Sequence, residues 1–138
     1  MERKLVACAV ALALGLLAAG CGSASGPLTR AAFMQRAGAL CVHRRAVYTP
    51  IIARAHGNAI AAIRAALPEY EAFVKQLGAL KPPASLRSAY TEILAFERRA
   101  LAAWRSTLSG RLPNLHDDGP PLHRHEALRR ELGMEACN

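Results

Sequence analysis

The chain has 138 residues, of which 52% are hydrophobic and 20% charged, and its formal net charge is +8. This length suffices for one domain around a single core and is too short for two. The basic balance does not indicate a nucleic acid partner, because the sequence contains no recognition motif for DNA or RNA.

The first twenty residues have the layout of a secretory signal. Arg3 and Lys4 precede fifteen residues, 5–19, without a charged or strongly polar side chain. Such a run would extend only about 22 Å as a helix, less than the ~30 Å hydrocarbon core that a permanent span must cross. Residues 1–20 are therefore predicted to be a cleaved signal peptide.

The end of this run, LLAAGC, places small residues directly before Cys21. The segment resembles the lipobox of bacterial lipoproteins, although Ala18 stands where leucine is usual. That resemblance implies that the thiol of Cys21 receives a diacylglycerol, with acyl chains such as palmitate, and becomes the mature N-terminus. The alternative is an ordinary cleaved signal with a cysteine nearby by chance.

A doubly acylated cysteine would hold the protein at the extracytoplasmic face of the cell membrane without help from its surface, because two chains give stable attachment. Residues 21–28 would then be the lipidated cysteine and a flexible tether, and residues 29–138 the folded domain. The segment 22–27 spans at most about 20 Å when extended. We therefore expect the domain to lie close to the membrane.

Four cysteines are present, but Cys8 lies in the predicted signal and Cys21 is the predicted acylation site. Cys41 and Cys137 remain, and the oxidising environment outside the cytoplasm favours a disulfide between them. The alternative is a pair of free thiols that bind metal or act in redox chemistry. That reading lacks a Cys-x-x-Cys motif and a histidine at ligand spacing.

Helical periodicity begins after Thr29, a predicted N-cap, and continues through a first helix over residues 30–48. Pro50 is expected to break or kink this helix, with a further turn over 51–55, because the residue before proline disfavours helical dihedral angles. No segment alternates with the period of a β-strand.

The second predicted helix lies between Asn58 and Lys81 and continues through Pro68 with a kink. Its apolar residues alternate between spacings of three and four, which predicts packing against other helices at a shallow crossing angle. These residues are Ile60, Ile63, Leu67, Tyr70, Val74 and Leu77.

Two further helices are predicted, over residues 86–108 and 121–132, separated by a polar loop rich in glycine and proline. Ser85 is expected to cap the first of them and Gly110 to follow its C-terminus. Glu97 falls on the apolar stripe of this helix; we expect it at the edge of the stripe, since a buried carboxylate would need a partner such as an arginine. The sequence predicts an all-α fold, an up-and-down four-helix bundle closed by a disulfide.

The mature chain is similar to small exported helical proteins of actinobacteria whose activity is not known. In these proteins a cysteine of the first mature helix pairs with one in a terminal Gly-Leu-x-x-Cys-like motif, and a Leu-x-Pro-Pro turn divides the middle helices. The corresponding residues are Cys41, the turn 80–83 and the segment 133–137, in which Met134 replaces leucine. The resemblance implies a fold and no activity.

Fourteen of the sixteen basic residues after Cys21 are arginines, opposed by nine acidic residues. Such a surface is attracted to anionic lipid headgroups or wall polymers. The alternative, which we favour for most positions, is that these residues only solvate the helices, because the pairs 44–45, 98–99 and 129–130 are dispersed over three helices. No protein partner is indicated.

The segment 116–126 contains His116, His123 and His125 among carboxylates. Imidazoles bind Zn²⁺ and Cu²⁺, so an envelope metal-binding protein is the alternative function. His123 and His125, two positions apart, point to different sides of a helix, and a solvated loop followed by a polar helix start is the simpler interpretation.

Enzymatic motifs are missing from the sequence. Glu92 and Glu97 do not belong to the Glu-x-x-His motifs of di-iron bundles, and there is no nucleophile elbow or phosphate-binding glycine loop. We therefore expect no catalytic residues and no cofactor. The leading hypothesis is a membrane-anchored protein with a binding or structural role, and binding of an apolar ligand between the helices is a third possibility.

Overall fold

The fold is seen in a computed structural model that describes residues 26–111 and 122–137. The predicted signal peptide, Cys21 and most of the predicted polar loop lie outside these residues. Within the described ranges every regular element is a helix, as predicted. No helix there is long and apolar enough to span a bilayer.

Helix α1, Arg30–Arg54, starts where the sequence predicts and ends later. Thr29 caps it, because the Thr29 hydroxyl accepts a hydrogen bond from the backbone N–H of Ala32 at 3.2 Å. The predicted end at Tyr48 is wrong, since the helix continues through Pro50 for another turn. Pro50 removes one backbone N–H, and its partner carbonyl belongs to the exposed Ala46, where water can replace the lost donor.

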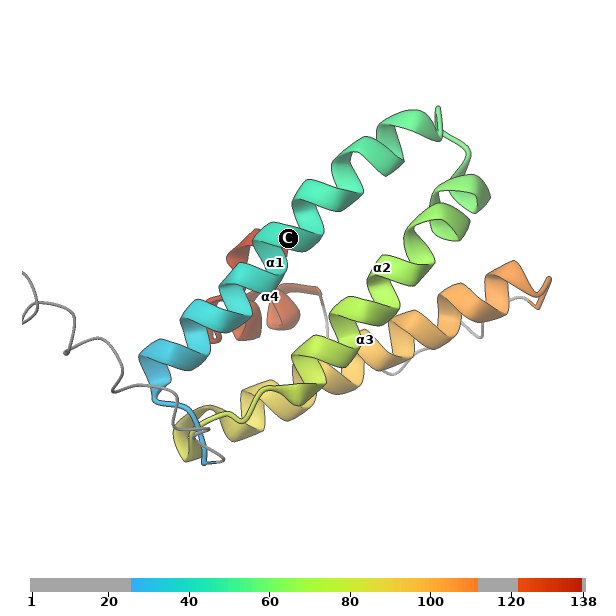
Figure 1. The fold of residues 1–138 in the computed structure, drawn as a ribbon. Coiled ribbons are helices and arrows are strands. Elements are labelled where there is room, and N and C mark those ends of the chain that lie inside the picture. Colours follow the sequence, from blue (N-terminus) through green and yellow to red (C-terminus); the bar gives the residue numbers. More distant parts are fainter. Residues whose placement is uncertain (1–25, 112–121, 138) are drawn as a thin grey trace, which may run out of the picture.

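Helix α2, Ala59–Ala79, is continuous through Pro68, as predicted. The side chain of Asn58 caps it by accepting from the N–H of Ala61 at 3.0 Å. Only the second half of the predicted apolar seam is buried. Tyr70, Val74 and Leu77 lie in the core, whereas Ile60 at the start of the helix is 43% exposed. The tip of the α1–α2 hairpin thus projects beyond the packed core (Figure 1).

Helix α3, Arg87–Leu108, follows a short 3-10 turn, η1, Ala84–Leu86. The expected Ser85 cap is wrong: Leu86 occupies the cap position, and no side-chain hydrogen bond caps either helix. Leu86 is fully buried, and the 3-10 turn itself pairs the N–H groups of Leu86 and Arg87 with the carbonyls of Pro83 and Ala84. Gly110 follows the helix with φ +74°, the left-handed conformation predicted there.

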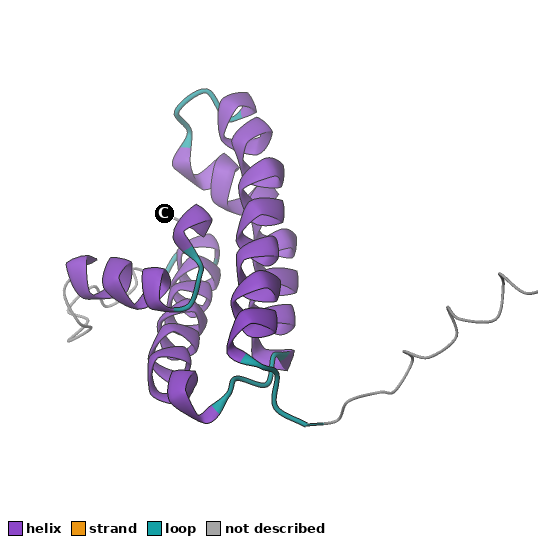
Figure 2. Ribbon diagram, turned by 90° about the vertical axis from the view of Figure 1, so that its left-hand side faces the viewer, coloured by secondary structure: helices purple, strands orange, loops and turns teal. Residues whose placement is uncertain are grey.

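The chain closes with α4, Leu122–Glu131, and a 3-10 turn, η2, Glu135–Cys137. The first three helices alternate in direction, α1 and α3 both pack on α2, α4 packs on α3, and η2 packs on α1. The four helices form an up-and-down bundle in which α4 is the shortest and lies across the others (Figures 1 and 2).

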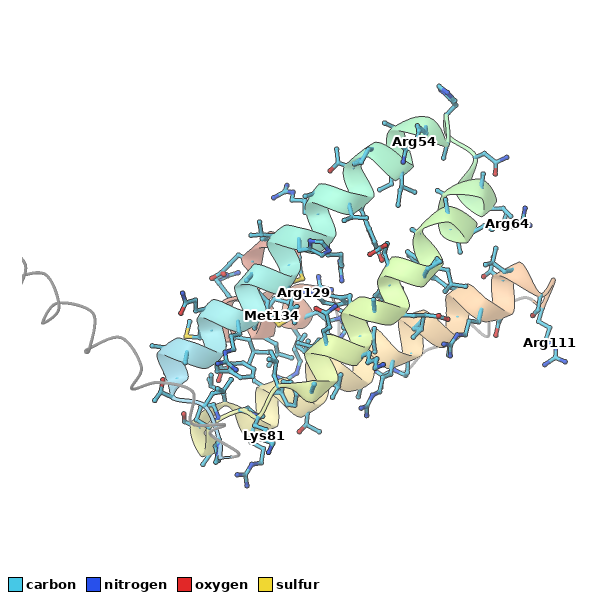
Figure 3. All side chains as sticks on the ribbon, viewed as in Figure 1. Arg54, Arg64, Lys81, Arg111, Arg129 and Met134 are labelled. Atoms are coloured by element: carbon cyan, nitrogen blue, oxygen red, sulfur yellow. A yellow bond between two sulfur atoms is a disulfide. The ribbon has the colours of Figure 1, made fainter. Side chains whose placement is uncertain are left out.

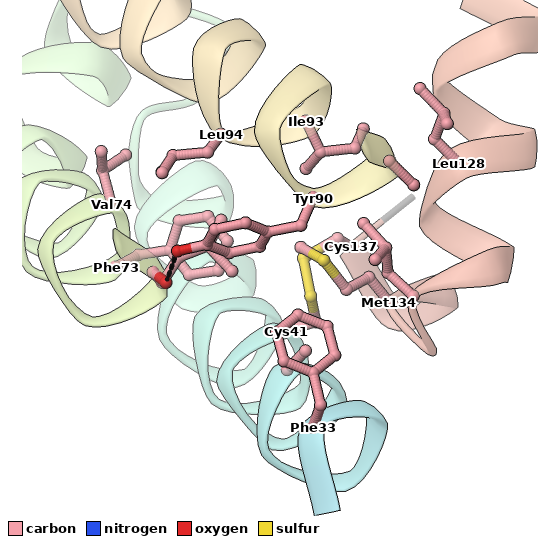
Figure 4. Close-up of a cluster of buried hydrophobic side chains, with 14 of the residues drawn as sticks. Phe33, Cys41, Phe73, Val74, Tyr90, Ile93, Leu94, Leu128, Met134 and Cys137 are labelled. Atoms are coloured by element: carbon pink, nitrogen blue, oxygen red, sulfur yellow. Dashed lines mark hydrogen bonds between the residues drawn. A yellow bond between two sulfur atoms is a disulfide. The ribbon is translucent and has the colours of Figure 1, made fainter. Parts of the chain in front are cut away.

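The Cys41–Cys137 disulfide joins α1 to η2, as predicted, with its Cα atoms 4.8 Å apart. Both cysteines belong to the core cluster, beside Phe33 and Met134 (Figure 4). In the loop-entropy argument, closing a loop of 96 residues stabilises the fold by about 4 to 5 kcal/mol. The covalent link holds the C-terminal turn against the first helix.

The backbones of α1 and the C-terminal turn touch at two glycines. A Cβ at Gly38 would lie 2.8 Å from the carbonyl oxygen of Gly133. A Cβ at Gly133 would lie 2.9 Å from the Cβ of Met34 and 3.2 Å from its carbonyl oxygen. Gly133 also has φ +72°, which L side chains rarely adopt. Glycine at both positions therefore allows η2 to lie close enough to α1 for the disulfide.

Candidate functional site

The most concentrated group of charges in the described residues surrounds Glu97 of α3. Glu97 lies on the apolar face of its helix and is 1% exposed, so the expectation that it would sit at the edge of the stripe is wrong. An unpaired carboxylate at this depth would be strongly unfavourable. The side chains that bind the Glu97 carboxylate therefore determine whether it has a structural or a chemical role.

Each of the three other α-helices supplies Glu97 with one hydrogen-bond donor. The Tyr70 hydroxyl donates to Oε2 at 2.7 Å, Arg44 Nη1 lies 3.4 Å from the same oxygen, and Arg129 Nη2 donates to Oε1 at 3.1 Å. These donors come from α2, α1 and α4 respectively. We call Glu97, Tyr70, Arg44 and Arg129 the Glu97 cluster.

Arg44 also connects the Glu97 cluster to the disulfide. Its Nη2 donates to the backbone carbonyl of Cys137 at 3.2 Å. Its guanidinium lies over the ring of Phe73, 4.6 Å from the centroid, and 5.6 Å from the centroids of Tyr48 and Tyr70. Cation–π contacts of this kind become stronger as the cation loses water. Arg44 thus contacts the carboxylate, the C-terminal turn and the three rings of Phe73, Tyr48 and Tyr70, which we call the aromatic wall.

The aromatic wall extends to Trp104, whose ring centroid is 4.6 Å from that of Tyr70 and 6.2 Å from that of Tyr48. Burial, and then the neighbouring Glu97 carboxylate, raise the pKa of Tyr70. Burial likewise raises the pKa of Tyr48 to about 12. Both phenols are therefore neutral at physiological pH, and Tyr70 acts as a hydrogen-bond donor to Glu97.

The Glu97 cluster has the properties of a structural lock. Both carboxylate oxygens already accept hydrogen bonds, and the Arg44 and Arg129 side chains are only 17% and 14% exposed. A hollow beside Arg44, between α1 and α2, has a volume of about 20 Å³, which is room for roughly one water molecule. Among the described residues, packed side chains therefore cover Glu97 almost completely.

Of the site residues predicted from the sequence, the structure brings together Cys41 and Cys137. Cys21 and His116 lie outside the described residues, as does the side chain of His123. His125 is 3% exposed and packs on Phe96, with ring centroids 3.9 Å apart. Burial, and then the charge of Arg129, hold the pKa of His125 below its usual range.

His125 is therefore buried against Phe96, outside the apolar core cluster. Neither ring nitrogen has a hydrogen-bond partner among the described residues. In the same part of the chain, no three His, Cys, Asp or Glu side chains are placed to hold a metal ion.

Arg44 and Arg129 are not recognisable from the sequence as members of a buried cluster. Each stands in an arginine pair that was expected to be exposed. The usable signal was Glu97 itself, because a carboxylate on an apolar stripe needs buried cations, and both arginines occur on other helices of the same bundle. Sequence periodicity does not say which member of each pair points inward.

Comparisons with protein-family models, with curated proteins and with solved structures found no match.

Proposed function

We propose that the chain is a membrane-anchored envelope lipoprotein with a binding or structural role and no enzymatic activity. The observation that carries the proposal is the sequence LLAAGC after a basic start and a short apolar run. Cys21 would carry the lipid and hold the protein at the extracytoplasmic face of the membrane.

Two features of the folded domain support this proposal. The first helical residue, Arg30, comes nine positions after Cys21, so a domain held by that cysteine would stay near the bilayer. The Cys41–Cys137 disulfide suits an oxidising compartment, which an exported protein would enter.

A non-enzymatic role is supported by the chemistry of the most concentrated charged group. All four members of the Glu97 cluster are engaged with one another, and the cluster joins four helices. Such an arrangement stabilises one rigid conformation, which suits a protein that presents a surface to another envelope component.

The metal-binding alternative depends on His116, His123 and His125. His125 is 3% exposed against Phe96, so its ring would have to leave this buried position to bind a metal ion. Calorimetric titration of the mature protein with Zn²⁺ and Cu²⁺ tests this alternative. Heat of binding that disappears in the His116→Ala/His123→Ala variant would support it.

The proposal is tested by fractionation of bacterial cells that express the full chain with Cys21→Ser. We expect the wild-type protein in the membrane fraction and the variant absent from it in processed form. The matched control is Cys8→Ser, which changes another cysteine of the N-terminal segment and should leave membrane association intact. A Cys21→Ser protein that remains with the membrane at the wild-type processed length would contradict the proposal.

A further inference from the structure

An open groove of about 580 Å³ runs along the outer side of the bundle between α2 and α3. Val74 and Leu101 contribute apolar side chains to it, and Gly78 leaves room where other residues would place a Cβ. We call it the α2–α3 groove.

The polar lining of the α2–α3 groove is mainly cationic. It consists of Lys75, Arg98 and Arg105, with Glu71 as the acidic member. Glu71 is bound to Arg105, with Oε1 2.7 Å from Nη2. Lys75 and Arg98 are exposed, and neither forms an ion pair within the described ranges. Two cations of the groove are therefore available to an external anion.

The position of Arg98 makes the groove more than a scattered set of surface charges. Its Nη2 atom lies 3.5 Å from the point where a Cβ on Gly78 would be. The guanidinium of this α3 residue thus lies next to Gly78 of α2. On α4, by contrast, Arg124 is paired with Glu92 and Arg129 with Glu97, which neutralises these two guanidinium groups.

One end of the groove faces the end of the domain where the tether enters, and the other end reaches Arg105 in the last turn of α3. Its lining reaches Ala79, two residues before Lys81, and the Lys81 carbonyl accepts a hydrogen bond from the N–H of Leu28 at 2.9 Å. Figure 3 shows Lys81 at the opposite end of α2 from Arg64. Only six residues, 22–27, separate Leu28 from Cys21, a reach of about 20 Å at most. A lipid at Cys21 would keep this end of the groove near the membrane surface.

We propose that the α2–α3 groove binds the headgroup of an anionic phospholipid in the membrane that holds Cys21. This inference rests on the proposed lipoprotein function. Lys75 provides a compact positive charge and Arg98 a planar guanidinium that donates two hydrogen bonds to a phosphate. Val74 and Leu101, which are 7% and 8% exposed, would give the glycerol only a small apolar contact at the floor of the groove.

The test uses the oxidised mature chain from residue 21 with Cys21→Ser, so that no acyl chain contributes to binding. Sedimentation compares vesicles of phosphatidylglycerol and phosphatidylcholine with vesicles of phosphatidylcholine alone. We expect binding to the anionic vesicles only. The Lys75→Gln/Arg98→Gln variant should bind them about 25-fold more weakly, since each basic side chain near an anionic surface contributes about fivefold.

The matched control is Arg54→Gln/Arg64→Gln, which also removes two exposed cations but at the far end of the α1–α2 hairpin (Figure 3). It should weaken binding by less than about threefold, because charges farther from the surface than a Debye length are screened. Circular dichroism at 222 nm checks that both variants keep their helices.

Three results would overturn the inference. Equal weakening by the two double variants would mean that diffuse charge attracts the protein. Equal binding to both vesicle types, or to neither, would exclude anionic headgroups as the ligand. Displacement by inorganic phosphate at the concentration of the lipid phosphate would mean that the groove prefers the free ion. Because the assay uses unacylated protein, none of these results depends on whether Cys21 is lipidated in cells.

Discussion

Substitution of Glu97 by glutamine tests the assignment of the Glu97 cluster as a structural lock. Glutamine has nearly the same volume but no charge, so Arg44 and Arg129 would lose their shared carboxylate while only 17% and 14% exposed. Removal of one partner from a buried ion pair costs about 3 to 5 kcal/mol. Arg44 keeps the Cys137 carbonyl and the ring of Phe73, so we expect the lower value, about 3 kcal/mol.

Urea unfolding of the oxidised mature protein, followed by circular dichroism at 222 nm, measures this loss. For a domain of this size the same loss lowers Tm by about 10 °C. The control is Glu71→Gln, because Glu71 also binds an arginine, Arg105, but the two side chains are 42% and 57% exposed. Exposed pairs contribute about 1 kcal/mol or less. If Glu97→Gln costs no more than Glu71→Gln, the cluster is not a lock.

Two further predictions concern packing and ionisation. Gly38→Ala should destabilise the fold by about 1 to 3 kcal/mol, because its Cβ would meet the Gly133 carbonyl at 2.8 Å. Gly78→Ala is the control in the same urea assay. It should be neutral or slightly stabilising, because the nearest new contact of its Cβ is 3.5 Å away. Burial raises the pKa of all three tyrosines, that of Tyr48 to about 12. Absorbance at 295 nm should therefore show little phenolate at pH 10 in the folded protein. In urea, about half of the tyrosine side chains should be ionised at the same pH. Because the folded pKa values lie above the unfolded one, stability should fall as pH rises above about 10; half-ionised tyrosines in the folded state at pH 10 would refute their burial.

The helical fold and the disulfide could be predicted because both depend on strong local signals. The spacing of apolar residues through α2 marks a helix even across Pro68, and elimination of the other cysteines leaves one pair. The end of α1 was placed wrongly because proline disfavours a helix locally but does not prevent one when the freed carbonyl faces water. The Ser85 cap failed because burial of Leu86 determined how α3 begins.

The buried charges were the least predictable part. Glu97 is the place where a local rule, that charged residues lie at the surface, conflicts with helical periodicity. Which rule prevails depends on partners that come from α1, α2 and α4, far away in the sequence. The expectation for His125 was also wrong. Its polar neighbours in the sequence suggested a solvated segment, but α4 places its ring against Phe96.

The central claim, a lipid on Cys21 and a disulfide between Cys41 and Cys137, is tested most directly by the intact mass of the protein from the membrane fraction. We predict a chain that begins at residue 21 and carries the added mass of a diacylglycerol. Alkylation of the denatured protein should modify no cysteine before reduction and two after it. A mass without acyl chains, or a chain that retains residues 1–20, would contradict the account.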